Sequence, residues 1–234
     1  MQRRTPIFII ASPRPRVGKT LLARMLAEFF RNDARPIAAF DVNPDEFNLM
    51  DYLPGYTAVA SVTETRGQIA LFDQLLAYEQ VPKVVDLGHA QFDKFFSVVH
   101  QINFIEEAKR RDLLPVVLFV AAADRRAKQG YDMLRNRFRG LALVPIFNDA
   151  LPQVMLDRAD FPSGRYGAPL ILPALSPTMK GILERPSFSF AALIAKSDTS
   201  MELYAWTRRV FLEFRELELR LLLAELRPAL KFSA

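Results

Sequence analysis

The chain has 234 residues, half of them hydrophobic, which is enough to fill the core of one α/β domain spanning residues 1–234. It has no cysteine and two histidines, which excludes disulfides, thiolate metal sites and cysteine nucleophiles and disfavours a histidine-rich metal site. Its 31 basic and 26 acidic side chains leave a formal charge of +5, a moderate excess that suits a polyanionic partner without requiring one.

Short apolar runs alternate with helix-length segments along the first three quarters of the chain. The first run, residues 7–11, leads into a Pro/Arg/Gly turn, and apolar residues then recur at helical spacing from Leu21 to Phe30. Further strands are predicted at 36–41, 81–86, 114–120, 141–147 and 169–172, and helices at 92–111 and 125–139. This alternation predicts an α/β fold, a mostly parallel twisted sheet flanked by helices on both faces.

The last part of the chain is predicted to be helical. A helix is expected over 188–196, and a long one over about 201–226, packed on the domain and ending before Pro228. Residues 52–65 and 151–167 are the least patterned, and the second of these is expected to be a surface loop. No apolar run reaches the roughly 18 residues of a membrane span, so the simplest expectation is a cytoplasmic protein.

The turn after the first predicted strand contains Val17, Gly18, Lys19 and Thr20. A phosphate-binding loop needs backbone N–H groups that face the phosphates, a lysine for the β and γ oxygens, and a hydroxyl on Mg²⁺. The helix that starts here also offers its free N–H groups to an anion. Although Pro13 replaces the usual leading glycine, the placement between a strand and an amphipathic helix predicts a nucleotide site.

Four segments together resemble the ParA/MinD group of P-loop ATPases. ASPRPRVGKTLLARMLAEFF is similar to the deviant Walker A loop K-G-G-V-G-K-T and its helix. FDVNPDEFNL is similar to the D-x-D-P-x stretch of that group, VVDLGHA to its Walker B strand and switch, and VPIFND to a later strand that ends in an asparagine. Plasmid partition and conjugation relatives carry a comparable D-L-G.

The resemblance implies roles for particular residues of a site that binds ATP and Mg²⁺. Lys19 would bind the β and γ phosphates, and Arg14 stands where the family has the lysine that crosses to the partner's phosphates in a dimer. Asn148 would face the base. The backbone around the phosphates would come from Arg16, Val17, Gly18, Lys19, Thr20 and Leu21, and the metal would be held by Thr20, Asp41 and Asp86.

Three departures from the family pattern bear on hydrolysis. Pro15 and Arg16 replace two glycines, and neither residue is expected to tolerate the backbone angles that glycine allows. Asn43 stands where the family has a second aspartate that positions the attacking water, and an amide orients water without accepting its proton. We therefore expect nucleotide binding with slow hydrolysis or none.

The segment from Lys109 to Arg139 concentrates the positive charge, with nine basic and three acidic residues. Arg125, Lys128, Arg135 and Arg139 are expected near one helix face, where they would contact a phosphate backbone without reading bases. A solvated helix face on a basic protein is the equally weighted alternative. Non-specific DNA binding is thus one hypothesis for this segment.

Three function classes remain open from the sequence. The first is an ATPase that forms a homodimer on binding Mg-ATP, acts as a switch for DNA or cargo partition, and meets a partner protein that stimulates hydrolysis. The second is a non-hydrolysing, nucleotide-dependent scaffold, and the third is a P-loop enzyme that phosphorylates or ligates a small molecule. A membrane role is not expected of the last helix, because residues 201–234 carry six basic and five acidic side chains and so have little attraction to anionic lipid.

Overall fold

The computed structural model describes residues 4–43, 49–151, 156–164, 166–196 and 201–230. Its strands are β1 (Thr5–Ala11), β2 (Ala38–Val42), β3 (Thr57–Val59), β4 (Lys83–Leu87), β5 (Leu113–Val120), β6 (Ala142–Asn148) and β7 (Leu170–Leu172). They form one sheet in the order β3-β2-β4-β1-β5-β6-β7, and every neighbouring pair is parallel. Each predicted strand coincides with an observed one, and the predicted α/β class is confirmed.

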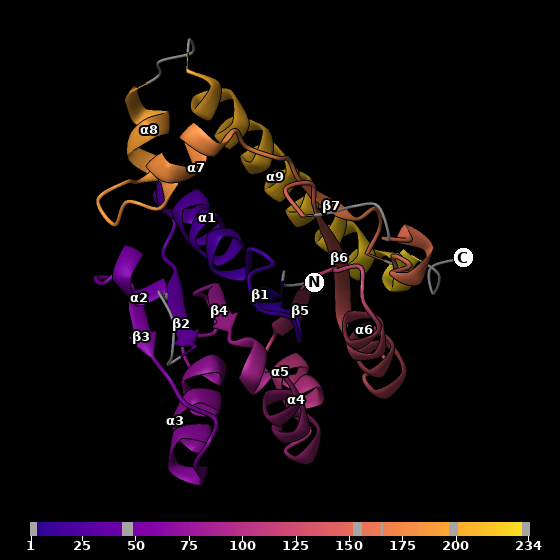
Figure 1. Ribbon diagram of the computed structural model, residues 1–234. Coiled ribbons are helices and arrows are strands. Elements are labelled where there is room, and N and C mark those ends of the chain that lie inside the picture. The colour runs from indigo at the N-terminus through magenta and orange to yellow at the C-terminus, as the bar shows by residue number, and fades with distance from the viewer. Residues whose placement is uncertain (1–3, 44–48, 152–155, 165, 197–200, 231–234) are drawn as a thin grey trace.

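Helices cover both faces of the sheet (Figure 1). They are α1 (Lys19–Asn32), α2 (Leu49–Tyr52), α3 (Thr65–Leu76), α4 (Phe92–Gln101), α5 (Phe104–Arg110), α6 (Arg125–Arg137), α7 (Pro177–Leu183), α8 (Phe190–Lys196) and α9 (Glu202–Leu230). Two short 3₁₀ turns, η1 (His89–Gln91) and η2 (Arg158–Asp160), follow β4 and β6. In the view of Figure 1, α1 and α7 to α9 lie on the upper side and α3 to α6 on the lower side.

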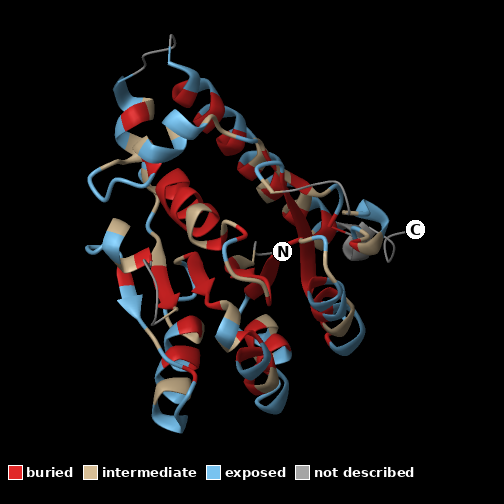
Figure 2. Ribbon diagram, in the orientation of Figure 1, coloured by how far each residue is buried: buried red, intermediate tan, exposed pale blue. Residues whose placement is uncertain are grey.

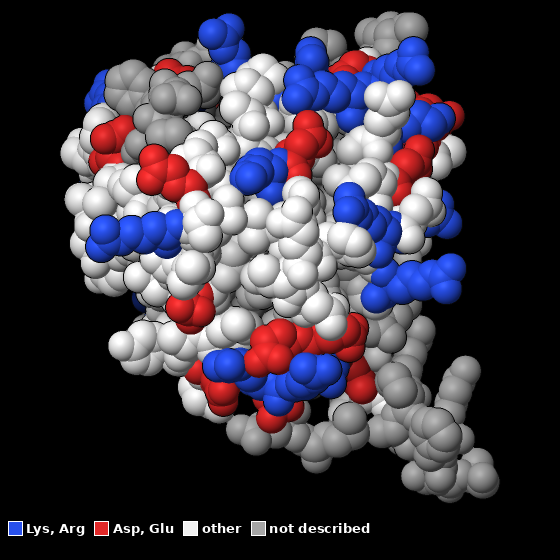
Figure 3. Space-filling view, turned by 90° about the horizontal axis from the view of Figure 1, so that it is seen from below, with Lys and Arg blue, Asp and Glu red and all other residues white. Residues whose placement is uncertain are grey.

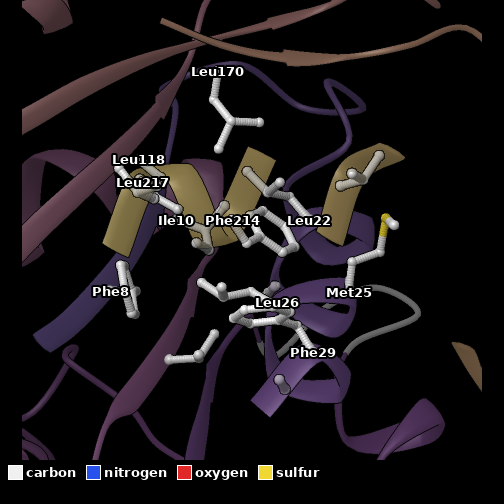
Figure 4. Packing of buried hydrophobic residues seen from close by; sticks show 14 of the residues in the cluster. Phe8, Ile10, Leu22, Met25, Leu26, Phe29, Leu118, Leu170, Phe214 and Leu217 are labelled. Carbon is white, nitrogen blue, oxygen red and sulfur yellow. The ribbon is translucent and has the colours of Figure 1, made fainter. Parts of the chain in front are cut away.

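Two separate apolar clusters fill the space between the sheet and its two helix layers. Apart from β3, two of whose three residues are exposed, the strands are almost wholly buried, whereas the outward faces of the helices are exposed (Figure 2). On the side of α1, Phe8 and Ile10 of the sheet meet Leu26 of α1 and Phe214 of α9 (Figure 4). Because both faces of the strands are covered, near-continuous apolar strand sequences are what this fold requires.

Three boundaries differ from the sequence prediction. The predicted helix 92–111 is two helices, because Asn103 adopts a left-handed conformation with φ of 52° between them. The poorly patterned stretch 52–65 contains β3, a three-residue strand too short to show a period. The α9 helix continues through Pro228 to Leu230, so the predicted end before this proline was wrong. A proline disfavours helix at the residue before it without forbidding it.

The order of the strands determines where the site lies. From β1, at the middle of the sheet, the chain first builds β2, β3 and β4 on one side and then β5, β6 and β7 on the other. The connections after β1 and β4 therefore leave toward opposite faces, and a crevice opens at the carboxyl ends of the central strands. The predicted loop follows β1 and lies at this edge.

Candidate functional site

The loop between β1 and α1 turns on two left-handed residues. Gly18 precedes the first residue of α1 with φ of 94°, and Arg16 has φ of 56°. The expectation that Arg16 does not take the conformation of the glycine it replaces was wrong, since the residue adopts that conformation. A non-glycine residue in this region costs on the order of 1 kcal/mol, so the loop keeps its shape under local strain.

The Asn148 side chain holds this loop from the end of β6. Its Nδ2 donates to the carbonyl oxygen of Val17 at 3.0 Å, and its Oδ1 accepts from the backbone of Ala150 at 3.0 Å. A Cβ at position 18 would lie 2.8 Å from the same Nδ2, so only glycine fits beside the amide. The structure thus places Asn148 against the loop backbone, while its expected contact with a base stays a prediction.

Lys19 is the first residue of α1 and is buried, with 8% of its surface exposed. Its Nζ donates to the carbonyl oxygen of Arg14 at 2.8 Å, so the side chain folds back across the loop. An ammonium enclosed by a loop of backbone groups at a helix N-terminus attracts an anion. This arrangement is what the predicted phosphate-binding role of Lys19 requires.

Asp86, at the end of β4, is the group whose environment is most unusual. It is 1% exposed, and neither carboxylate oxygen has a hydrogen-bond partner within 3.5 Å among the described residues. The pKa of Asp86 is raised to about 7, chiefly by burial and also by the negative charge of Asp41, while nearby Thr20 and Lys19 act to lower it. A buried acceptor without a partner indicates that something else binds there.

Asp41 is the neighbour of Asp86 across β2 and β4, where the two residues are paired in register. Its Oδ1 accepts from the backbone N–H of Asn43 at 3.0 Å and its Oδ2 from that of Met50 at 3.1 Å. Burial raises the pKa of Asp41 also, although these N–H groups oppose the shift. Asp41 therefore holds the start of α2 in addition to its predicted role beside a metal.

The residues expected to hold Mg²⁺ fit such an ion. The free oxygens of Asp86 and the nearby hydroxyl of Thr20 are the oxygen ligands that Mg²⁺ prefers, and this ion commonly binds through one or two carboxylates together with phosphates and water. No group of three or more His, Asp or Glu side chains gathers anywhere in the described part of the chain. These residues therefore do not form a metal site in which protein side chains supply all the ligands.

Two predicted catalytic residues lie at the rim. The Arg14 guanidinium forms an ion pair with Asp124, Nε to Oδ2 at 3.0 Å, which holds it toward the start of α6. Asn43 follows β2, and its Oδ1 would lie 2.8 Å from a Cβ at position 88, so Gly88 permits the ends of β2 and β4 to approach. Asp45, a carboxylate two residues beyond Asn43, lies outside the described residues.

Several of these groups line a cleft of about 440 Å³, while Arg14, Asp41 and Asp86 are not among the residues that line it. Its loop side is formed by Arg16, Gly18, Lys19, Thr20, Leu21, Asn43, His89 and Asn148. Its opposite side, here called the helix side, is formed by Pro173 and Leu175 after β7, by Lys180, Leu183 and Glu184 in and after α7, and by Trp206 of α9, with Arg24 and Tyr52 also lining it. The loop side was predicted from sequence, and the helix side was missed.

One signal for the helix side was present in the sequence. Arg24 and Glu28 form a charged pair four residues apart within an otherwise apolar helix, in line with Thr20 and Leu21. No pattern marks α7, whose seven residues have one buried side chain, Leu183. Trp206 is buried, and it also lines the cleft.

The four basic residues proposed for DNA do not share one helix face. Arg139 lies beyond the end of α6, so its expected place on that helix was wrong. Lys128 is paired with Asp160, while Arg125 lines a groove beside Pro13, and Arg135 lines a separate hollow with Arg139. Seen from below, basic side chains are accompanied by acidic ones over the face formed by the lower helices (Figure 3).

None of the helices within the described ranges combines the length and the apolar character needed to cross a bilayer.

Comparisons with known proteins give one kind of match. No protein-family model matches the chain, and no curated protein matches it. Among solved structures, the chain is similar to a ParA family ATPase from Chlorobium tepidum TLS, with 13% sequence identity and a TM-score of 0.44 over 88% of this chain and 97% of that one. A match at this level assigns no function, which has to be argued from the residues of the cleft.

Proposed function

We propose that this chain is a ParA/MinD-like nucleotide-binding protein that takes Mg-ATP into the cleft. The observation that carries the proposal is Asp86, a wholly buried carboxylate without a hydrogen-bond partner among the described residues, beside Thr20 and Lys19 at the N-terminus of α1. A buried anionic oxygen set next to an anion-attracting loop calls for a cation that bridges the two. Mg²⁺ bound to a nucleotide supplies that cation and neutralises charge on the phosphates.

The chain's own residues then have distinct tasks. Lys19 exchanges its contact with the Arg14 carbonyl for phosphate oxygens, while Gly18 and Arg16 present backbone N–H groups. Asp86 and Thr20 hold the metal, with Asp41 beside them. Asn43 orients a water without removing its proton, so turnover is slow, and a non-hydrolysing nucleotide-dependent scaffold is the second candidate that this amide favours.

Binding is tested with Mg-ATP on the wild type and Lys19→Ala, with Lys94→Ala as the control. Lys94 is an exposed lysine of α4 that does not line the cleft. We expect affinity to fall at least about 100-fold in Lys19→Ala and to stay unchanged in Lys94→Ala, as the loss of a charge-assisted contact predicts. Equal affinity in wild type and Lys19→Ala, or a measurable ATP turnover of the wild type that Lys19→Ala leaves unchanged, would rule out the assigned site.

We further propose that ATP binding brings two copies face to face, with Arg14 reaching the partner's phosphates. In that state Arg14 must leave Asp124. Asp124→Asn removes the ion pair but keeps a side-chain oxygen at the N-cap of α6. In the wild type, Asp124 Oδ1 accepts hydrogen bonds there from the first backbone N–H groups of the helix. Since an exposed ion pair contributes at most about 1 kcal/mol, this variant should dimerise up to about fivefold more tightly with ATP.

The dimer is measured by analytical ultracentrifugation with and without ATP. Arg14→Ala should abolish the ATP-dependent dimer and leave the monomer intact. A monomer indifferent to nucleotide in the wild type would contradict the switch while leaving nucleotide binding as measured.

The proposed role of such a switch is partition or positioning of DNA or another cargo in the cytoplasm, together with a partner protein that stimulates hydrolysis. Its DNA arm rests on the net charge and on Arg125, Arg135 and Arg139. Binding of duplex DNA is measured over a salt series with ATP present, in wild type and in the triple alanine variant of these residues. No affinity at low salt would reject DNA as the partner, and the same salt dependence in both proteins would reject these three arginines as its contact.

A further inference from the structure

A buried ion pair lies on α1, one turn beyond the residues of the loop side. The side chains of Arg24 and Glu28 are 2% and 0% exposed, and Nε of the arginine lies 3.2 Å from Oε1 of the glutamate. Burying two charges is costly, and their attraction compensates only when further hydrogen bonds satisfy both groups. The other partners of the pair therefore show what it is built to hold.

Those partners all belong to the connection between α7 and α8. Arg24 donates from Nη1 to the carbonyl oxygen of Leu183 at 2.7 Å, and from Nη2 to that of Phe188. Glu28 accepts at Oε2 from the hydroxyl of Ser189 at 2.5 Å and from the backbone N–H of Ala191 at 3.0 Å. The pair thus ties the nucleotide-site helix α1 directly to the backbone at the end of α7 and the start of α8.

Aromatic rings fix the plane of the guanidinium. Its central carbon lies 4.4 Å from the ring centre of Tyr52, 5.1 Å from that of Phe190 and 5.4 Å from that of Phe188. A cation enclosed by ring faces is held electrostatically, and the planar fork of arginine donates in fixed directions. A lysine would not reproduce this geometry.

The segment held in this way is a wall of the cleft. Helix α7 lies with α8 above α1 in Figure 1, and Lys180, Leu183 and Glu184 line the cleft from it. Seven residues are too few for a helix that is stable without tertiary contacts. The position of this wall therefore depends on what anchors it, and Arg24 bonds to the carbonyl of Leu183, one of its lining residues.

The helix side differs in chemistry from the loop side. Pro173, Leu175, Leu183 and Trp206 give it an apolar surface. The indole Nε1 of Trp206 donates to the Pro173 carbonyl at 2.9 Å, which keeps the two lining residues together. These four residues offer nothing to phosphate groups and suit the flat apolar faces of a base, while Lys180 and Glu184 line the same side.

We infer that Arg24, with Glu28, is a positioning residue that preorganises the helix side of the cleft for the nucleoside part of the nucleotide. The inference rests on the proposed function and adds a division of the cleft to it. The loop side, apart from Asn148 at its edge toward the base, binds the triphosphate, and the wall anchored by Arg24 binds base and ribose. Without the anchor, the wall has to be ordered during binding. This cost weakens the binding of the nucleoside part of the nucleotide and leaves that of the triphosphate part unchanged.

The test compares two probes, Mg-ATP and Mg-tripolyphosphate, by isothermal titration calorimetry. The proteins are wild type, Arg24→Met, and Arg24→Met combined with Glu28→Leu, which removes both charges and so protects the fold. We expect ATP to bind about tenfold more weakly to both variants, equivalent to about 1.4 kcal/mol, and tripolyphosphate to bind as tightly as to wild type. The control is Arg31→Met, which removes another stacked arginine of α1, 4.1 Å from the ring centre of Tyr56 and outside the cleft.

Four results are distinguishable. Selective loss of ATP affinity supports the inference. ATP affinity that is unchanged in the double variant overturns it, as does an equal loss for both probes, which would place the effect of Arg24 on the loop. Failure of the wild type to bind either probe overturns the proposed function itself, and the inference with it.

Discussion

The cleft joins two regions that treat buried charge in opposite ways. Beside the loop side, Asp86 is buried with neither oxygen hydrogen-bonded within the described structure, next to a loop with left-handed residues at positions 16 and 18. Beside the helix side, Arg24 and Glu28 are equally buried but are satisfied by each other and by four groups of the α7–α8 connection. Unsatisfied charge and strain mark a place for a ligand, whereas satisfied charge in a regular helix marks an anchor.

The anchor is broken most severely by removing one of its charges. Arg24→Met leaves Glu28 buried without its counter-charge, and we expect the free energy of unfolding to fall by about 4 kcal/mol. The free energy of unfolding should fall by less in the double variant Arg24→Met with Glu28→Leu, because no charge stays buried. Urea denaturation followed by circular dichroism measures both. A double variant less stable than the single one would show that the pair is not a satisfied anchor.

Removing the buried charge of Asp86 should raise the free energy of unfolding, whereas removing that of Arg24 should lower it. The pKa of Asp86 rises from 3.8 to about 7, so the folded state holds a proton that the unfolded state releases, and stability falls as pH rises between about 4 and 7. At pH 8 the whole penalty applies, and Asp86→Asn should stabilise the protein without ligand by about 4 kcal/mol. Thermal unfolding at pH 5 and pH 8 provides the readout.

A smaller gain from Asp86→Asn at pH 5, about 1.5 kcal/mol, serves as the internal control for that prediction, because only the part of the penalty between about pH 4 and pH 5 applies there. The variant should also lose Mg²⁺-dependent ATP binding, because the amide lacks the charge that holds the cation. Equal stability of wild type and variant at pH 8 would mean that the Asp86 carboxylate is satisfied after all.

Substitution of Gly18 tests whether the loop between β1 and α1 requires glycine at this position. Gly18→Ala places a methyl group 2.8 Å from Asn148 Nδ2 at a residue with φ of 94°, and we expect a loss of about 2 kcal/mol in unfolding free energy. Gly181→Ala is the matched control in α7, where an added Cβ meets no atom within 4 Å. It should gain up to about 1 kcal/mol. An equal loss of unfolding free energy in Gly18→Ala and Gly181→Ala would show that position 18 does not specifically require glycine.

The smallest expected effect concerns the strained arginine. Arg16→Gly relieves the left-handed conformation and should stabilise the protein by about 0.5 kcal/mol, since the greater freedom of glycine in the unfolded chain offsets part of the relief. Arg209→Gly, at an exposed position of α9, should instead cost about 1 kcal/mol. A loss at position 16 as large as that at position 209 would indicate that the loop is not strained in solution.

Local pattern was sufficient for much of the fold. The apolar runs that became β1, β2, β4, β5, β6 and β7 are buried on both faces, so their composition reports the sheet directly. Segments whose structure depends on few residues were missed or misread, as with β3 and the break at Asn103. A three-residue strand has no period, and a single left-handed residue interrupts a helix without changing its apolar spacing.

The sequence by itself determined the loop side of the cleft, because Gly18, Lys19 and Thr20 are contiguous and their chemistry follows from their order. Only the tertiary structure decided the rest. Asp86 and Asp41 become neighbours through strand register, and Arg24 meets Leu183 and Phe188 across more than 150 positions of chain. Such contacts are chosen by packing of the whole domain, and no local spacing records them.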